Sequence, residues 1–225
     1  MKLSTFSIPG MFTKLIDIST GISADTPVYE GDPAPLIEKV SSIGKDGFVV
    51  SRISIGTHTG THVDAPAHII AGGKCVDELD PLSFMGKAML LDLSKGEGRI
   101  TADELDEYYI KNPDKEDVDI LLLKTDNEPS PHSLLKSQRL LAASAGNWVL
   151  EHGFRLVGVD TLSVDADSSL PNHHLFLRNG LNIVELLNLS HVEAGTYIFI
   201  CLPLKLIGCD ASPARAILIQ RSSII

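Results

Sequence analysis

The stretch from His58 to His68 constrains the fold more than any other part of the chain. Its sequence is His-Thr-Gly-Thr-His-Val-Asp-Ala-Pro-Ala-His, which brings three histidines and one aspartate into eleven residues. A helix is disfavoured here, because the threonines are β-branched, Gly60 weakens a helix and Pro66 blocks its continuation. We therefore expect extended or turning chain, on which imidazole and carboxylate groups converge on a divalent metal ion.

The residues before this motif suggest how the ligands converge. From 48 to 55, apolar and polar residues largely alternate, which is typical of a strand with one apolar face. If this alternation continues past Gly56, then His58, His62 and Asp64 all lie on the polar face. The spacing therefore predicts a metal site on one side of a strand.

Further ligands must come from distant sequence. His173 and His174 follow Pro171-Asn172, and Glu185 is the one acid between Asp167 and Glu193. One of these histidines and the glutamate are therefore candidates for a second ion. Divalent ions lower the pKa of bound water toward neutrality and polarise a carbonyl group. This chemistry favours hydrolysis.

His68 lies beyond the expected end of the strand, since it follows Pro66. We expect it near the metals without binding them. A free imidazole there suits proton transfer to a departing nitrogen or oxygen, because its ordinary pKa is close to neutrality.

Composition narrows the class of protein. The chain has 225 residues, of which 44% are hydrophobic and 21% charged, as expected for one domain over residues 1–225 with an N-terminal arm over residues 1–12. A net charge of -10 without a basic stripe argues against a nucleic-acid or anionic-membrane partner. No apolar run is long enough to span a bilayer and no cleavable leader is evident, so we expect a cytoplasmic protein.

Strand-like and helix-like segments alternate along much of the chain, which predicts an α/β domain. Thr101 and Glu104 form a capping-box pattern at the start of one helix. Asp210 and Arg215 flank Ala-Ser-Pro and are interpreted as a structural ion pair at a turn. The expected strands are 15–18, 87–93, 118–124, 156–160 and 216–219, the expected helices start at 101 and span 133–151, and two further elements span 182–187 and 196–204.

Several motifs together resemble the putative cyclase family, which includes bacterial kynurenine formamidases and isatin hydrolases. The central motif is the most specific of them. The matching pieces are Asp17-Ile-Ser, Pro27-Val-Tyr-Glu-Gly-Asp-Pro33, the stretch from His58 to His68, His173 with Glu185, and Leu202-Pro-Leu with Asp210-Ala-Ser-Pro-Ala-Arg215.

The resemblance implies a role for each site residue. His58 and His62 would bind one metal ion together with Asp64, while Asp64 and Glu185 would bridge to a second ion. His173 would bind that second ion, because the family spaces this histidine twelve residues before the glutamate. The resemblance also implies that His68 is the catalytic acid/base. Zinc is the first expectation for the metal, and manganese is the alternative.

The resemblance further implies a single domain of the swivelling β/β/α type, with a mixed sheet and flanking helices, and a homodimer. One position departs from the family's formamidases, which carry Trp where this chain has Tyr29. That residue is expected to contact the substrate, and a tyrosine ring can still stack on an aryl group.

These observations predict a metal-dependent hydrolase that cleaves an amide C–N bond through metal-bound hydroxide. N-formylkynurenine is the leading substrate, which would make the protein an arylformamidase. One alternative is a hydrolase of a cyclic amide of the isatin type. A different class is a non-catalytic binding protein in which the metal stabilises the fold.

Overall fold

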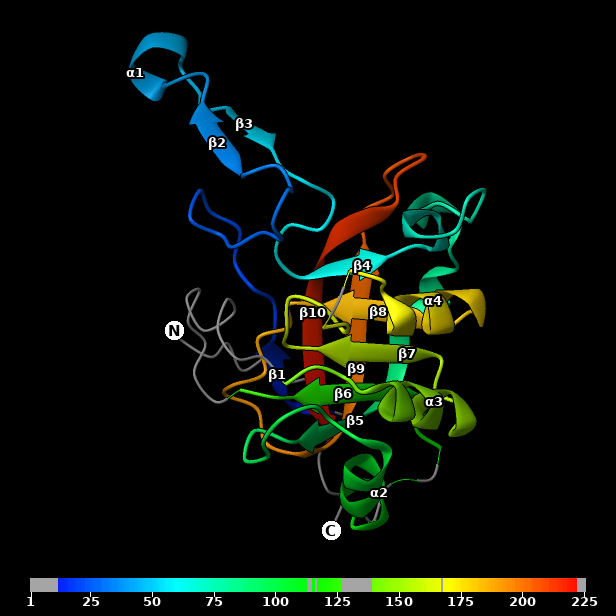
Figure 1. Ribbon diagram of the computed structural model, residues 1–225. Helices are drawn as coiled ribbons and strands as arrows, with labels where there is room; N and C mark the ends of the chain where they lie inside the picture. Colours follow the sequence, from blue (N-terminus) through cyan, green and yellow to red (C-terminus); the bar gives the residue numbers. More distant parts are fainter. Residues whose placement is uncertain (1–11, 113–114, 116, 127–138, 167, 222–225) are drawn as a thin grey trace.

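Eight of the strands form one mixed sheet that closes on itself. The computed structural model describes residues 12–112, 115, 117–126, 139–166 and 168–221. The sheet closes because β9 pairs with β10 as well as with β5, while β1 lies beside β10 (Figure 1). The strand order is β1 (Phe12–Asp17), β10 (Ala211–Arg221), β4 (His62–Asp64), β8 (Asn182–Glu185), β7 (Leu156–Val159), β6 (Ile120–Lys124), β5 (Met85–Asp92) and β9 (Gly195–Pro203).

The four neighbouring strands β5, β6, β7 and β8 run parallel, and they are buried on both faces. Their side chains alternate between two hydrophobic cores. Leu121 and Val157 pack with residues of three helices, α2 (Ala102–Ile110), α3 (Ala143–Glu151) and α4 (Pro171–Arg178), which cover one face (Figure 1). Leu122 and Leu156 pack on the other face, inside the closed sheet.

Short 3-10 helices follow β4 in sequence: η1 (Pro66–His68), η2 (Val76–Glu78) and η3 (Pro81–Phe84). The first begins at the proline expected to end the strand. Of the described helices, none is long and apolar enough to cross a membrane.

Most expected elements are present with shifted ends, including the helix at Thr101, whose hydroxyl accepts the Glu104 N–H at 3.4 Å. The expected helix over 133–151 is shorter than predicted. It begins at Ala143, residues 139–142 are not helical, and residues 133–138 lie outside the described part. The predicted arm over 1–12 also lies outside the described part except for Phe12, which begins β1.

The strand predicted over 48–55 does not have a buried face. Its central residues form β3 (Ser51–Ser54), whose one strand partner among the described residues is β2 (Leu36–Lys39). Both strands are exposed throughout. Together with α1 (Ile43–Asp46) they form the arm over residues 36–54, which projects away from the closed sheet (Figure 1). A single α/β domain with a mixed sheet and flanking helices is confirmed.

Candidate metal centre

β4 carries two of the expected ligands on one face. His62 and Asp64 are two residues apart in this strand, so their side chains point the same way. In the antiparallel pairing with β8, His62 lies directly opposite Glu185. The Nε2 atom of His62 is 3.4 Å from Asp64 Oδ1 and 3.5 Å from Glu185 Oε2. Two neighbouring strands therefore bring three expected ligands together.

His58 reaches the same place by a different route from the one predicted. The chain turns at residues 57–60 instead of continuing as a strand, and Gly60 has a φ of +66° within this turn. A Cβ atom on Gly60 would lie 2.8 Å from Ile22 Cγ1, so glycine is needed for space as well as for conformation. The turn places His58 Nδ1 3.0 Å from Asp64 Oδ1. The expectation that continuous strand parity aligns His58 is therefore wrong, although the convergence itself is observed.

His173 enters from the first turn of α4. Its Nε2 atom is 3.4 Å from Asp64 Oδ2 and 3.3 Å from Glu185 Oε1. Asp165 holds the start of this helix, because its carboxylate accepts the backbone N–H groups of Asn172 and His173, each at 2.9 Å. The ligand atoms form two groups that share Asp64, each with atoms within 4.8 Å of one another: His58 with His62 and Asp64, and His173 with Glu185 and Asp64.

In His58, His62 and His173, the ring nitrogen that faces away from the carboxylates of Asp64 and Glu185 is paired with an acceptor. This arrangement orients metal-binding histidines, because it leaves the nitrogen that faces the carboxylates available for coordination. The pairs are His58 Nε2 with Asp210 Oδ2 at 3.1 Å, His62 Nδ1 with the Gly60 carbonyl at 2.8 Å, and His173 Nδ1 with Asp165 Oδ2 at 2.8 Å.

Some buried polar atoms of the site have no hydrogen-bond partner that would satisfy them, which also favours a bound cation. Both carboxylate oxygens of Asp64 and the Nε2 atom of His62 are buried without a hydrogen-bond partner. A buried carboxylate is costly unless it is paired or coordinates a metal. Oxygen and imidazole ligands without thiolate suit Zn or Mn. The residues present therefore fit a divalent metal.

Proton binding at the site follows the same charges. Burial by itself lowers the pKa of His62, but the Asp64 and Glu185 carboxylates outweigh it and raise the pKa to about 10. For His173, burial is outweighed by Asp165, Asp64 and Glu185, and the pKa rises to about 12. Burial raises the pKa of Asp64, but the surrounding imidazoles hold it well below its ordinary value. The direction of these pKa shifts shows that the buried carboxylates favour positive charge at this position, which a divalent cation would supply.

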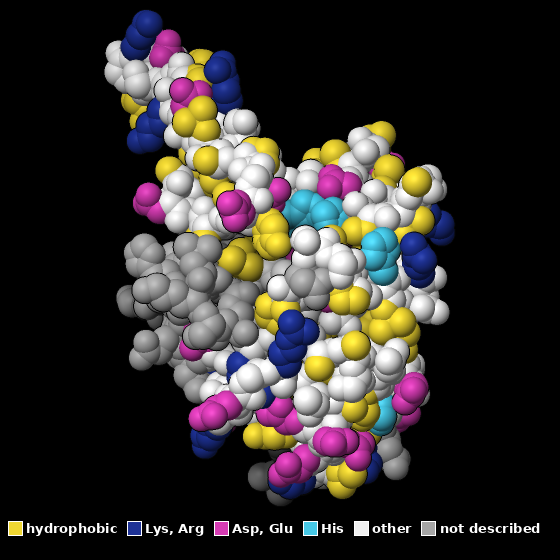
Figure 2. Space-filling view, viewed as in Figure 1, with side chains coloured by type: hydrophobic (Ala, Val, Ile, Leu, Met, Phe, Trp, Pro, Cys, Tyr) yellow, Lys and Arg dark blue, Asp and Glu magenta, His cyan; other side chains and the backbone are white. Residues whose placement is uncertain are grey.

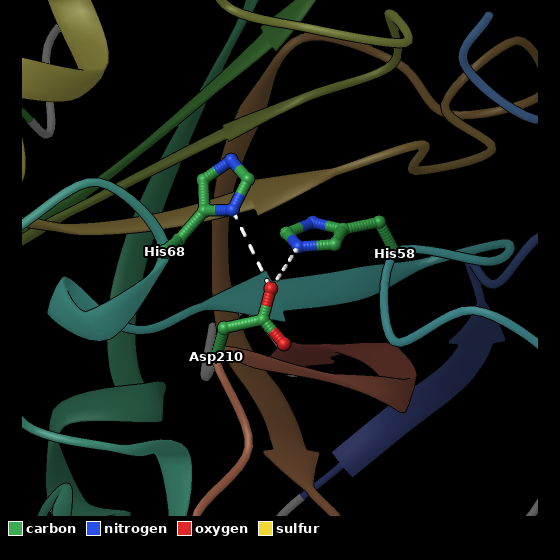
Figure 3. A group of neighbouring side chains, drawn as sticks. All are labelled: His58, His68 and Asp210. Atoms are coloured by element: carbon green, nitrogen blue, oxygen red, sulfur yellow. Dashed lines mark hydrogen bonds and ion pairs between the residues drawn. The ribbon is translucent and has the colours of Figure 1, made fainter. Parts of the chain in front are cut away.

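His68 lies beside these groups, as expected from its place after β4. Its ring centroid is 4.3 Å from that of His58 and 5.8 Å from that of His173. It belongs to neither group that contains Asp64, but it does meet Asp210, whose Oδ2 atom is 3.5 Å from His68 Nδ1 (Figure 3). Burial lowers the pKa of His68.

The predicted ion pair between Asp210 and Arg215 is wrong. Arg215 instead binds Asp17, with Nη2 2.5 Å from Oδ2, because the side chains of neighbouring strands β10 and β1 meet there. Asp210 turns to the histidines. Asp165 is likewise a site residue that sequence reasoning missed, and its signal was an acid eight positions before His173 at the start of a helix.

A cavity of about 200 Å³ opens beside these residues. Tyr29 lines it, as expected for a substrate contact, and its side chain is half exposed. Figure 2 shows histidine side chains reaching the surface at the foot of the projecting arm. The lining also includes His58, His62, His68, His173 and Glu185, the apolar Leu162, Leu170 and Leu186, and the polar Asp32, Ser163 and Ser168.

Comparison with known proteins bears on this arrangement. The family model described as putative cyclase matches residues 16–166. A kynurenine formamidase of Bacillus thuringiensis (strain Al Hakam) is 36% identical over 206 residues, covering 90% of this chain and 96% of that protein. A kynurenine formamidase of Bacillus anthracis is 35% identical over 209 residues, covering 92% and 97%.

Solved structures agree. A potential metal-dependent hydrolase with cyclase activity is 30% identical, with a TM-score of 0.75 and coverage of 93% of this chain and 98% of that chain. An isatin hydrolase bound to thioisatinate shares the fold, with a TM-score of 0.82 at 23% identity and coverage of 92% of both chains. Because the putative cyclase model matches residues 16–166 and the kynurenine formamidases match about nine tenths of its length, the chain belongs to the putative cyclase family.

Proposed function

We propose that this protein is a metal-dependent hydrolase of the arylformamidase type, which cleaves the amide C–N bond of N-formylkynurenine. One observation carries the proposal. Two groups of ligand atoms share the fully buried carboxylate of Asp64 beside a cavity. The kynurenine formamidases among the relatives support the choice of substrate.

We propose two divalent ions, with zinc as the first candidate and manganese as the second. His58 and His62 would hold one ion and His173 the other, with Asp64 shared between them. Glu185 groups with Asp64 and His173, so we assign it to the second ion instead of to the second bridge that the family resemblance implies. Bound ions of this kind lower the pKa of a coordinated water and polarise the carbonyl that it attacks.

His68 is the proposed acid/base. Because its pKa is lowered, the ring is neutral at neutral pH and is ready to accept a proton. It then delivers that proton to the departing nitrogen. Tyr29 stands at the mouth of the cavity, where its ring offers a face to an aryl group.

The proposed assembly is a homodimer formed through the arm over residues 36–54. A two-stranded hairpin is at best marginally stable alone, and this one exposes an unusual number of large apolar side chains. They include Leu36, Ile37, Val40, Ile43, Phe48, Val49, Val50 and Ile53. A second copy of this chain is the proposed partner. The arm carries three basic and two acidic residues, a net charge of +1, which is complementary to the net charge of -10 of the whole chain. The swivelling β/β/α classification, the extent of the domain over 1–225 and a cytoplasmic location remain sequence-based proposals.

The test is hydrolysis by protein from which metal has been removed and then restored with Zn²⁺ or Mn²⁺. We expect N-formylkynurenine to be cleaved only after metal is restored. Isatin is assayed in parallel, and faster turnover of isatin would overturn the choice of a formamide substrate. Turnover of neither, with metal fully bound, would favour a binding protein stabilised by its metal.

A further inference from the structure

Asp210 meets two site histidines with a single oxygen atom. Its Oδ2 atom is 3.1 Å from His58 Nε2 and 3.5 Å from His68 Nδ1, and Figure 3 shows both rings directed at it. The second oxygen is also engaged, because Oδ1 accepts a hydrogen bond from the Thr57 hydroxyl at 3.0 Å. The carboxylate is therefore held in one orientation by three partners.

The backbone ties Asp210 to the strand that carries the ligands. Its carbonyl accepts the Ala65 N–H at 2.9 Å, and the next residue, Ala211, is the register partner of Asp64. The position of this carboxylate relative to the metal ligands is thus set by main-chain bonds between β10 and β4. The hairpin loop over residues 204–210 joins β9 to β10, and the bond between Ala65 and Asp210 anchors the end of this loop to the chain after β4.

A neutral imidazole has one N–H donor and one acceptor nitrogen, and a carboxylate accepts only from the donor. Asp210 therefore accepts a hydrogen bond from the His58 proton on Nε2, so that Nδ1, which lies 3.0 Å from Asp64 Oδ1, is the nitrogen that would coordinate a metal. His68 Nδ1 is the nitrogen nearer to this carboxylate, at 3.5 Å, so a proton on Nδ1 would face Asp210. Figure 3 shows the other nitrogen of His68, Nε2, directed away from Asp210.

We propose that Asp210 is a positioning residue that sets the tautomers of His58 and His68 together. One carboxylate would prepare His58 to coordinate a metal through Nδ1 and His68 to exchange a proton through Nε2. The part concerning His68 rests on the proposed function, whereas the part concerning His58 needs only a metal.

The first experiment needs no substrate. Side-chain ¹⁵N NMR of histidine-labelled, Zn-loaded protein reports which ring nitrogen carries the proton, and a His68→Ala spectrum assigns the His68 signals. We expect a protonated Nδ1 in the native protein and a mixture of tautomers in Asp210→Ala. Titration of the metal-free protein with Zn²⁺ against a chelating dye should show about 10- to 100-fold weaker binding in that variant, the usual effect of losing an outer partner of a metal-binding histidine.

Kinetics with N-formylkynurenine give the second readout. Asp210→Ala should lower kcat by about 10- to 100-fold, while KM changes by less than about threefold, because the residue does not line the cavity. Asp210→Asn keeps an acceptor oxygen and should recover part of the loss.

Asp77→Ala is the matched control. Asp77 accepts the Gly208 N–H at 2.9 Å and so supports the same hairpin without being part of the site. We expect native tautomers, Zn²⁺ affinity and kcat in this variant. Equal losses in Asp77→Ala and Asp210→Ala would reduce Asp210 to a loop support and overturn the proposal, as would unchanged tautomers and Zn²⁺ affinity in Asp210→Ala. If native protein does not cleave N-formylkynurenine, the proposed function fails, while the NMR and Zn²⁺ results still decide the role of Asp210.

Discussion

His62 and Glu185 are direct register partners across the antiparallel pair β4 and β8, and their side chains meet at 3.5 Å. This relationship places ligands of both proposed ions on a rigid ladder between neighbouring strands. Asp64 lies on the same face of β4, and it alone belongs to both ligand groups. Substitutions of Asp64 and Glu185 should therefore have different effects on the number of bound ions.

We expect Asp64→Asn to lose both ions, because each ligand group loses its shared carboxylate. Glu185→Gln should lose only the ion held with His173. Elemental analysis after dialysis against Zn²⁺ gives the stoichiometry of each variant, and circular dichroism checks the fold. Native metal content in Asp64→Asn would contradict the bridging role.

His68→Gln should keep its full complement of metal, since His68 belongs to neither group that contains Asp64. Loss of the proton-transferring group should lower kcat by about 10²- to 10⁴-fold. Metal content and kcat are measured on the same preparation. Loss of metal along with activity would show that His68 is a ligand.

Metal uptake should release protons at pH 7. The pKa of His62 is raised from 6.5 to about 10 and that of His173 to about 12 in the metal-free protein, so both rings are protonated at this pH. Coordination requires neutral imidazole, and the metal must displace those protons. Zn²⁺ affinity should therefore increase with pH, and calorimetry in buffers of different ionisation enthalpy counts the protons released.

The stability of the metal-free protein should depend on pH with the opposite sign. A folded-state pKa above the unfolded value contributes stability that is fully present below pH 6.5 and is lost as pH rises through about 10 for His62. The Tm of metal-free protein should thus fall from pH 6 to pH 10. A Tm that rises over this range would show that the histidines are neutral in the metal-free fold.

Gly60→Ala should destabilise the protein and weaken metal binding. The left-handed backbone alone costs about 1–2 kcal/mol for a residue with a Cβ, and the added atom would lie 2.8 Å from Ile22 Cγ1. Gly153→Ala is the matched control, because Gly153 has a φ of +74° with no atom within 4 Å of the added Cβ. Urea unfolding should show a loss in both variants, whereas Zn²⁺ affinity should fall only in Gly60→Ala.

Ile53→Asp should convert the proposed dimer to a monomer, because the side chain is 61% exposed in the arm. Ile110→Asp is the control, since Ile110 is similarly exposed, at 59%, on α2 of the body. Sedimentation equilibrium gives the mass of each. A native protein that sediments as a monomer would rule out the arm as a self-association surface.

The candidate ligands could be predicted from sequence because their chemistry is local and unusual. Histidine and aspartate two residues apart before Pro66 indicate a short strand that ends at the site, and this strand is β4. The path of His58 could not be predicted, because period-two alternation describes an exposed hairpin as well as a half-buried strand. Only tertiary contacts show that β3 leaves the main sheet.

The role of Asp210 was hidden for a related reason. Arg215, the cation that follows Asp210 in sequence, lies farther along β10 and pairs across the sheet with Asp17. Short-range charge pairing is a poor guide where a strand begins, because the partners are chosen by the strands on each side. The closure of the sheet by β9 and β10 was likewise absent from the local pattern.

β4 is flanked by β8 and β10, both of which follow it in the chain, and β10 is the last strand described. During synthesis, the motif from His58 to His68 leaves the ribosome long before either neighbour exists. The nascent motif cannot form the shared Asp64 geometry, because Glu185 and His173 follow it in the chain. We therefore expect the ligand set for the proposed ions to be complete only once β8 and β10 have joined β4.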